Sequence, residues 1–191
     1  MNSERFEALI DAVLAIIITI IVLEIPLASQ GTWTSLFEYR LEFITYAVSF
    51  IACFNFWNYH QNLFSLVNRI DYKILWIDGI SLLILSFLPY LTTFVAENFY
   101  SPLAQGLYGL NFVSVIALNQ LSAYILKNID KGNIALQLAL GSSKPAVISF
   151  TILIIGYIIG FTVYPPAIII ACLFSQFISI PITKLIKKFR R

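Results

Sequence analysis

The chain has 191 residues, of which 59% are hydrophobic and only 12% are charged. Average globular domains are roughly 45–50% apolar and about 25% charged, so this composition excludes an ordinary soluble domain and favours a protein folded in lipid. The formal net charge of +2 gives no indication of nucleic-acid binding, because the basic residues flank the apolar runs.

The apolar runs predict an all-α membrane protein, a single domain over residues 1–191 with six transmembrane helices. A helix needs about 20 mainly apolar residues to cross a bilayer. Such segments are found at about 6–26, 38–62, 74–96, 102–126, 145–163 and 165–184. The last two are separated at Pro165-Pro166, because proline cannot donate a hydrogen bond within a helix and restricts the residue before it.

The positions of the basic residues predict the orientation. With six spans, eleven of the twelve Lys and Arg residues fall on one side of the membrane, and only Arg40 falls on the other. Because basic loops stay on the cytoplasmic side, both termini are expected in the cytoplasm, with the protein in the cell membrane. The loops leave no room for a soluble domain, so the function is expected to reside in the membrane.

Polar residues lie near the cytoplasmic ends of the first two spans. Asp11 lies about 9 Å beyond Arg5 along the first helix. The second span runs in the opposite direction and carries Trp57 and His60 near its cytoplasmic end. Ionisable groups at membrane depth usually face protein or water, so these side chains are interpreted either as hydrogen bonds between the two helices or as a proton sensor.

The remainder of the first span is apolar on all sides and carries one hydroxyl. Ile16, Ile20 and Leu23 follow the spacing i, i+4 and i+7 and form one stripe. Taken alone, such a stripe is typical of ordinary helix packing. Thr19, next to the stripe, can bond back to the preceding turn.

Catalysis is the least supported function. The single histidine lies in no recognisable motif with a Ser or Cys nucleophile, and no cluster has metal-ligand spacing. Cys53 and Cys172 lie inside apolar runs and are expected to be small packing residues. No catalytic residue, metal or cofactor is therefore predicted.

Several of these residues together resemble a known family. Arg5, followed after three residues by Leu9-Ile10-Asp11, is similar to the Arg-x-x-x-Phe-Ser-Asp motif of the lysosomal potassium channel family, which comprises transmembrane protein 175 and its shorter bacterial relatives. Trp57-x-x-His60 and Leu88-Pro89-Tyr90 also stand where that family has similar residues. Here Leu and Ile replace the Phe and Ser of the motif, and the acid remains.

The resemblance implies a homotetramer whose first helices line a central pore. It places the constriction at Ile16 and further pore-facing positions at Thr19, Ile20 and Leu23. Arg5, Asp11, Trp57 and His60 correspond to the family's structural or gating polar network. The chain has no Thr-Val-Gly-Tyr-Gly segment, so it lacks a carbonyl filter. The function implied is a potassium-permeable cation channel, weakly selective for K⁺ over Na⁺, with protons as a second candidate permeant ion.

The implied partners are further copies of the chain, the lipid bilayer and monovalent cations, with no cofactor besides permeant K⁺. A secondary transporter is the main alternative. Transporter folds tend to show paired repeats with helices interrupted at corresponding positions, whereas Pro89 and Pro181 form no obvious pair. A membrane scaffold without transport is a third hypothesis.

Overall fold

The computed structural model describes the backbone of residues 3–67, 70–141 and 144–189, and the side chains of residues 5–67, 70–141 and 144–178. Over this part of the chain the ordered elements are all helices, which agrees with the predicted all-α class. In chain order they are α1 (Ser3–Leu23), α2 (Trp33–Glu38), α3 (Arg40–Phe64), α4 (Tyr72–Leu85), α5 (Leu88–Glu97), α6 (Pro102–Ile129), α7 (Ile134–Ala139), α8 (Lys144–Thr162) and α9 (Ala167–Phe189).

Local side-chain chemistry explains several helix boundaries. Asp71 caps α4 by accepting a hydrogen bond from the backbone N–H of Lys73 at 2.8 Å. Ser101 caps α6, and Pro102 occupies the first turn, where a missing N–H costs nothing. Pro89 likewise lies in the first turn of α5, so the predicted third span is divided after Leu85. As expected, Pro165-Pro166 separates α8 from α9.

Four helical segments are long and apolar enough to cross a membrane. They are Arg5–Leu23, Tyr72–Glu97, Pro102–Ile129 and Ile134–Thr162. Helix α3 has 25 residues and is about 37 Å long, but five amide or imidazole side chains lie in its second half and lower its hydropathy. The described apolar part of α9, Ala167–Ile178, is shorter than a full span.

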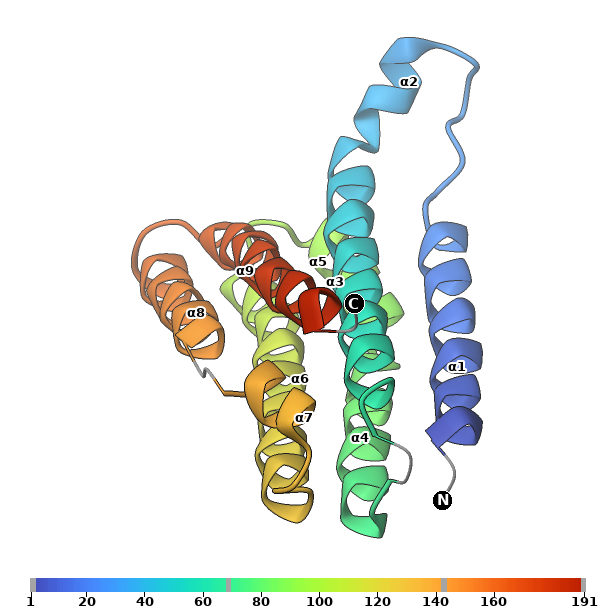
Figure 1. Cartoon of the computed structure of the whole chain (residues 1–191). Helices are drawn as coiled ribbons and strands as arrows, with labels where there is room; N and C mark the ends of the chain where they lie inside the picture. The colour runs from blue at the N-terminus through green and yellow to red at the C-terminus, as the bar shows by residue number, and fades with distance from the viewer. Residues whose placement is uncertain (1–2, 68–69, 142–143, 190–191) are drawn as a thin grey trace.

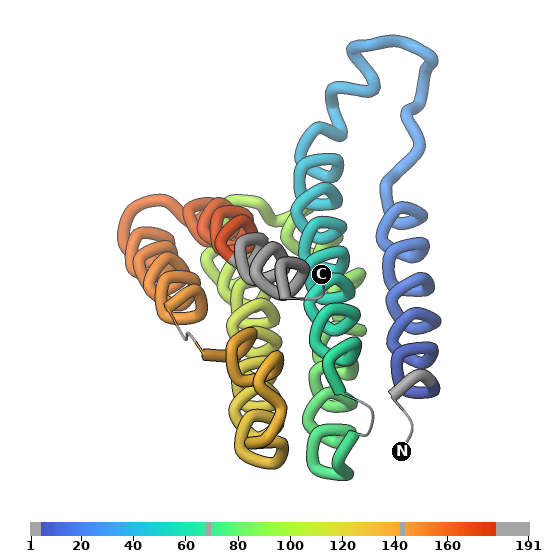
Figure 2. The backbone as a smooth tube through the Cα atoms, in the orientation of Figure 1, coloured from blue at the N-terminus to red at the C-terminus, as the bar shows by residue number. Residues whose placement is uncertain are grey.

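Helix α3 lies near the centre of the bundle. It packs against α1, α5 and α9, while α4 packs along α6 and α9 along α8. Helix α1 lies at one edge of the molecule and α8 at the opposite edge (Figure 1). A long extended connection joins α1 to α2, beyond the end of α1 (Figure 2).

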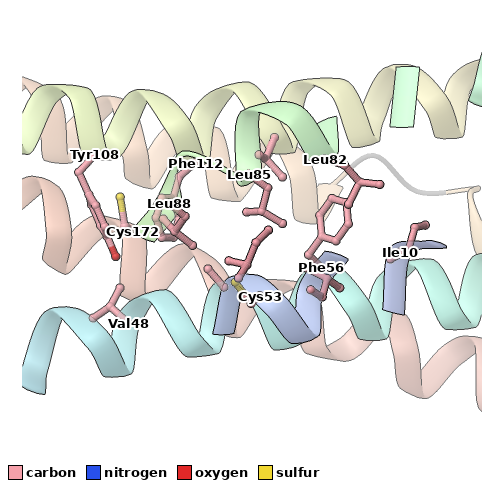
Figure 3. Close-up of a cluster of buried hydrophobic side chains, with 14 of the residues drawn as sticks. Ile10, Val48, Cys53, Phe56, Leu82, Leu85, Leu88, Tyr108, Phe112 and Cys172 are labelled. Atoms are coloured by element: carbon pink, nitrogen blue, oxygen red, sulfur yellow. The ribbon is translucent and has the colours of Figure 1, made fainter. Parts of the chain in front are cut away.

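The buried core lies between α1, α3, α4, α5, α6 and α9. Its members include Val48, Cys53, Phe56, Leu82, Leu85, Leu88, Tyr108, Phe112 and Cys172 (Figure 3). Lipid tails are as apolar as these side chains, so within a bilayer such a core is held mainly by van der Waals packing and interhelical hydrogen bonds.

A buried hydroxyl cluster adds polar contacts to this core. The Ser49 hydroxyl on α3 lies 2.7 Å from that of Thr92 on α5 and 2.8 Å from that of Tyr108 on α6. All three side chains are buried, and the cluster therefore ties three helices together at one point.

Glycines allow α8 and α9 to approach closely. A Cβ atom at Gly156 would overlap the Cβ of Ala171, and a Cβ at Gly160 would lie 2.5 Å from Cγ1 of Ile168. The spacing Gly156-x-x-x-Gly160 is of the kind that brings membrane helices into backbone contact.

Candidate functional site

Helix α1 has one face that packs on the rest of the chain. Phe6, Ile10, Leu14, Ile17 and Ile21 recur every three or four residues, and each is at most 3% exposed. They face α3 and α5, and the ring of Phe6 lies 5.7 Å from that of Phe64 on α3. This face fixes how α1 is rotated about its axis.

The opposite face of α1 carries all four residues predicted to line a pore. Ile16 is 59% exposed, Ile20 is 40% exposed and Leu23 is 80% exposed, and Thr19 is exposed beside them. These exposed fractions show that the face is open in the described part of the chain, so it is available to lipid, to another copy of the chain or to a pore. A continuous apolar face of this size normally marks an interaction surface or a surface in contact with lipid.

Thr19 bonds within its own helix. Its Oγ1 lies 2.8 Å from the carbonyl oxygen of Ile16 and 3.0 Å from that of Ala15. The hydroxyl donates its proton to these carbonyl oxygens, which is the bond to the preceding turn that the sequence analysis considered. The lone pairs of Oγ1 stay on the exposed face, where they can accept a hydrogen bond or contact a cation.

A side-chain hydrogen bond joins α1 to α3. Trp57 Nε1 donates to Asp11 Oδ1 over 2.8 Å. The ring of Phe54, one turn earlier on α3, lies 5.7 Å from the Trp57 ring. The structure thus joins two of the four predicted network residues by a hydrogen bond, and His60 lines the same small hollow as these two.

His60 pairs with a different acid. Its Nε2 lies 3.8 Å from Asp78 Oδ1 on α4, and its Nδ1 lies 2.9 Å from the carbonyl oxygen of Phe56. A carbonyl only accepts, so Nδ1 must carry a proton, and Nε2 then has a lone pair unless the ring is charged.

The surroundings of the His60–Asp78 pair are dry and aromatic. His60 is 1% exposed and Asp78 is fully buried. The rings of Phe56, Tyr59 and Phe64 lie 4.1, 5.3 and 5.5 Å from the imidazole. Neither carboxylate oxygen of Asp78 has a hydrogen-bond partner among the described residues.

Arg5 lies apart from this pair. It is exposed near the start of α1, and within the described side chains no hydrogen bond or ion pair joins it to Asp11, Trp57 or His60. Asp78 is the polar residue that the predicted network lacked. Its signal in the sequence is an acid inside the apolar run of 72–85.

No group of three metal-ligating side chains occurs in the part of the chain that the structure describes. Cys53 and Cys172 are both free thiols and are fully buried. They lie in the core of the bundle (Figure 3).

Several known proteins have a similar sequence. The family described as the endosomal/lysosomal potassium channel TMEM175 matches residues 5–89. A potassium channel of Chryseobacterium sp. (strain P1-3) is 33% identical over 162 residues, which are 84% of this chain and 84% of that protein. A potassium channel of Chamaesiphon minutus (strain ATCC 27169 / PCC 6605) is 32% identical over 110 residues, or 54% of each chain.

A solved structure has the same arrangement of helices. The crystal structure of a lysosomal potassium-selective channel TMEM175 homologue from Chamaesiphon minutus matches with a TM-score of 0.76 and 21% identity, over 94% of this chain and 97% of that chain.

The apolar helices and these likenesses define a multi-pass helical membrane protein. The matched residues 5–89 include Asp11 on α1, Trp57 and His60 on α3, and Pro89 on α5. The chain belongs to the TMEM175 potassium channel family, in its bacterial form, which confirms the resemblance seen in the sequence.

Proposed function

We propose that the chain is one subunit of a potassium-permeable cation channel, weakly selective for K⁺ over Na⁺. In this proposal four copies surround a central pore, α1 lines it, and Ile16 forms the constriction. The observation that supports this most directly is the exposed apolar face of α1, which carries Ile16, Ile20 and Leu23 on the side away from the bundle. Relatives named as potassium channels add further support.

The chemistry of that face accounts for the proposed selectivity. Four Ile16 side chains around an axis form a narrow apolar ring, which strips water from an ion and closes the pore when it dewets. Potassium loses its hydration shell at lower cost than sodium does. No carbonyl filter adds to this discrimination, so the proposed selectivity is weak. Beyond the Ile16 ring, the lone pairs of four Thr19 hydroxyls contact the ion. Protons are a second permeant species in this proposal.

The polar contacts between α1, α3 and α4 form the proposed structural or gating network. The Trp57–Asp11 hydrogen bond holds α1 against α3, and the His60–Asp78 pair holds the next turn of α3 against α4. In this proposal the first contact determines how firmly α1 is held against α3, and the second braces α3 against α4. Arg5 lies at the membrane boundary of the same helix end.

The proposed topology has six spans in one domain over residues 1–191, with α3 and α9 crossing in addition to the four apolar segments. Eleven of the twelve basic residues then lie on the side of the two termini. By the positive-inside rule this side is the cytoplasm, and the membrane is the cell membrane.

The experiment that tests the channel is ion flux in proteoliposomes under K⁺, Na⁺ and Cs⁺ gradients. We expect fast, non-saturating flux that favours K⁺ over Na⁺. Ile16→Asn should raise the flux and weaken the discrimination, because an amide holds water at the constriction. Ile158→Asn is the matched control, since Ile158 is 60% exposed but lies on α8 at the opposite edge, and its flux should equal that of the wild type.

Two results would contradict the proposal. Slow flux that saturates with ion concentration would establish a transporter instead. Equal effects of Ile16→Asn and Ile158→Asn would remove Ile16 from the pore.

A further inference from the structure

An apolar groove runs along the outside of the bundle between α6 and α8. It is partly open and has a volume of about 510 Å³. None of the described residues that line it is charged, and none belongs to α1, α3 or α4. Leu110, Ile154 and Phe161 in its walls are each more than half exposed, so a bound molecule can contact them. We call it the α6–α8 groove.

Tyr157 on α8 is the one polar side chain among the described residues of this lining. Its hydroxyl donates to the carbonyl oxygen of Gly106 on α6 over 2.7 Å. The groove therefore offers no free hydrogen-bond donor. A polar or charged molecule would lose its hydration here without gaining a partner, so the occupant must be apolar over its bound length.

The groove has the length of one leaflet of a bilayer. Its lining runs from Pro102 to Val113 on α6 and from Phe150 to Phe161 on α8. At about 1.5 Å per residue, each stretch is about 17 Å long. The hydrocarbon core of a bilayer is about 30 Å thick, or about 15 Å per leaflet. An acyl chain occupies one leaflet, whereas a transmembrane helix of a partner would continue through both.

The volume of the groove agrees with a single acyl chain. A cavity of about 150 Å³ holds benzene, so each carbon atom takes about 25 Å³. A space of about 510 Å³ then holds about twenty carbon atoms, which is the size of one phospholipid chain.

Two exposed tyrosines lie at the end of the groove that reaches the membrane surface. Tyr100 precedes Pro102 by two residues, and Tyr164 follows Phe161 by three. The two tyrosine rings lie 6.3 Å apart. Tyrosine is enriched where the hydrocarbon of a bilayer meets the headgroups, so the headgroup of a lipid in the groove should lie beside these rings.

Charge at this end of the groove favours one kind of headgroup. The connections at this end, residues 98–101 and 163–166, contain no charged residue, and the first follows the exposed Glu97. An anionic headgroup would find no basic partner in them. An ammonium group would be attracted to the carboxylate of Glu97 and to the faces of the tyrosine rings.

A second copy of the chain fits the groove less well than a lipid does. Stable protein interfaces use about 20–30 residues a side, whereas twelve residues line the groove. In the proposed channel α1 faces the pore, and α8 lies at the opposite edge of the molecule (Figure 1). The groove then lies on the perimeter that faces lipid, a step that rests on the proposed function.

We propose that the α6–α8 groove is a binding site for one zwitterionic phospholipid, such as phosphatidylethanolamine. One acyl chain lies in the groove, between Leu110 of α6 and Ile154 of α8. The headgroup lies beside Tyr100 and Tyr164, with its ammonium group toward the rings. Because this lipid contacts two helices along a whole leaflet, it exchanges more slowly than the lipids around it.

The test counts the lipids that remain bound to the full chain in detergent, by native mass spectrometry. Palmitoyl-oleoyl phosphatidylethanolamine and palmitoyl-oleoyl phosphatidylglycerol have the same chains, and only the first carries an ammonium group. We expect one retained phosphatidylethanolamine per chain. Retention of phosphatidylglycerol should be about two- to fivefold weaker, because the contact of an ammonium group with exposed aromatic rings is lost.

Two neighbouring isoleucines on α8 provide a matched variant and control. Ile154 lines the groove, whereas Ile155 is also exposed but does not line it. Ile154→Trp should narrow the groove and abolish the retained lipid, and Ile155→Trp should keep it. If circular dichroism shows that Ile154→Trp does not fold, Leu110→Trp narrows the groove from α6 instead.

Three outcomes would overturn the proposal. Equal retention of both lipids would mean that the end of the groove does not select the headgroup. Equal retention in Ile154→Trp and Ile155→Trp would place the lipid elsewhere on the protein. No retained lipid in the wild type would mean that only freely exchanging lipid enters the groove. Ion flux is measured separately, so failure of this site and failure of the proposed channel are distinguishable.

Discussion

Trp57 of α3 donates its indole N–H to Asp11 of α1 over 2.8 Å, and this bond joins the helix with the exposed apolar face to the central helix of the bundle. The two residues are 46 positions apart in sequence and lie on helices that run in opposite directions. Any force that rotates or lifts α1 must stretch or break this bond.

Replacing Trp57 with Phe removes the donor and keeps an aromatic ring. We expect the free energy of unfolding to fall by about 1 kcal/mol, because the bond is partly accessible and its loss leaves Asp11 without the indole donor. Thermal unfolding in detergent measures the change. Trp33→Phe is the control, since Trp33 is 87% exposed on α2, and it should leave the midpoint unchanged. Equal midpoints for the two variants would show that the bond contributes nothing to stability.

If His60 and Asp78 interact directly, the changes in the free energy of unfolding caused by replacing each of them should not add. His60→Leu alone leaves the fully buried side chain of Asp78 without its imidazole neighbour and should cost about 3 kcal/mol or more. The double variant His60→Leu/Asp78→Leu removes both polar groups and should be more stable than His60→Leu, because a buried pair can be replaced by apolar side chains at little cost. A double-mutant cycle from denaturant unfolding tests this. A double variant less stable than the single one would contradict a direct interaction between the two side chains.

Close packing of α8 on α9 predicts opposite effects at two glycines. Gly156→Ala places a methyl group against Ala171 and should destabilise the fold by about 1–3 kcal/mol. Gly79→Ala on α4 meets nothing within 4 Å and should stabilise it by about 0.5–1 kcal/mol, because alanine favours a helix. The midpoint of thermal unfolding should thus move down for the first and up for the second. Movement in the same direction would mean that α8 and α9 do not pack as described.

Thr19→Val tests whether the hydroxyl on the exposed face of α1 contacts permeating ions. The hydroxyl proton bonds only within α1, so the fold should be unaffected while the ratio of K⁺ to Na⁺ flux moves toward one. Thr151→Val is a matched control, since the Thr151 hydroxyl also bonds four residues back, to Val147 at 2.8 Å, but on α8. An unchanged flux ratio in Thr19→Val would mean that the hydroxyl does not contact the ion.

Much of the fold follows from residues that act locally. Proline ends or begins a helix whatever its neighbours are, so the break at Pro165-Pro166 was predicted from the sequence. The third span was predicted as one helix, and the structure divides it between Leu85 and Leu88. The short helices α2 and α7 were not predicted. They lie in the connections between predicted spans, and each begins where the side chain of Thr32 or Asn133 accepts a hydrogen bond from a backbone N–H three residues on. Such six-residue turns depend on one cap and leave no periodic pattern in the sequence.

The partner of His60 shows what a single sequence does not contain. The depth of His60 in the membrane was inferred from the direction of the second span. At that depth both Asp11 and Asp78 are possible partners. The choice between the two acids depends on the rotation of α3. Trp57 and His60 are three residues apart and therefore about 60° apart around the helix, which is enough for one to face α1 and the other α4. That rotation is fixed by how all the helices pack together.

The burial of both cysteines has a practical consequence for chemical labelling. Cys53 and Cys172 are the two cysteines of the chain, and neither has any exposed surface. A bulky, membrane-impermeant thiol reagent therefore finds no reactive group on the native protein. Single cysteines can be introduced along α1, at positions 16, 19, 20 and 23, without first removing the natural ones. The rate at which each is modified would then report directly whether water reaches that position, and from which side of the membrane.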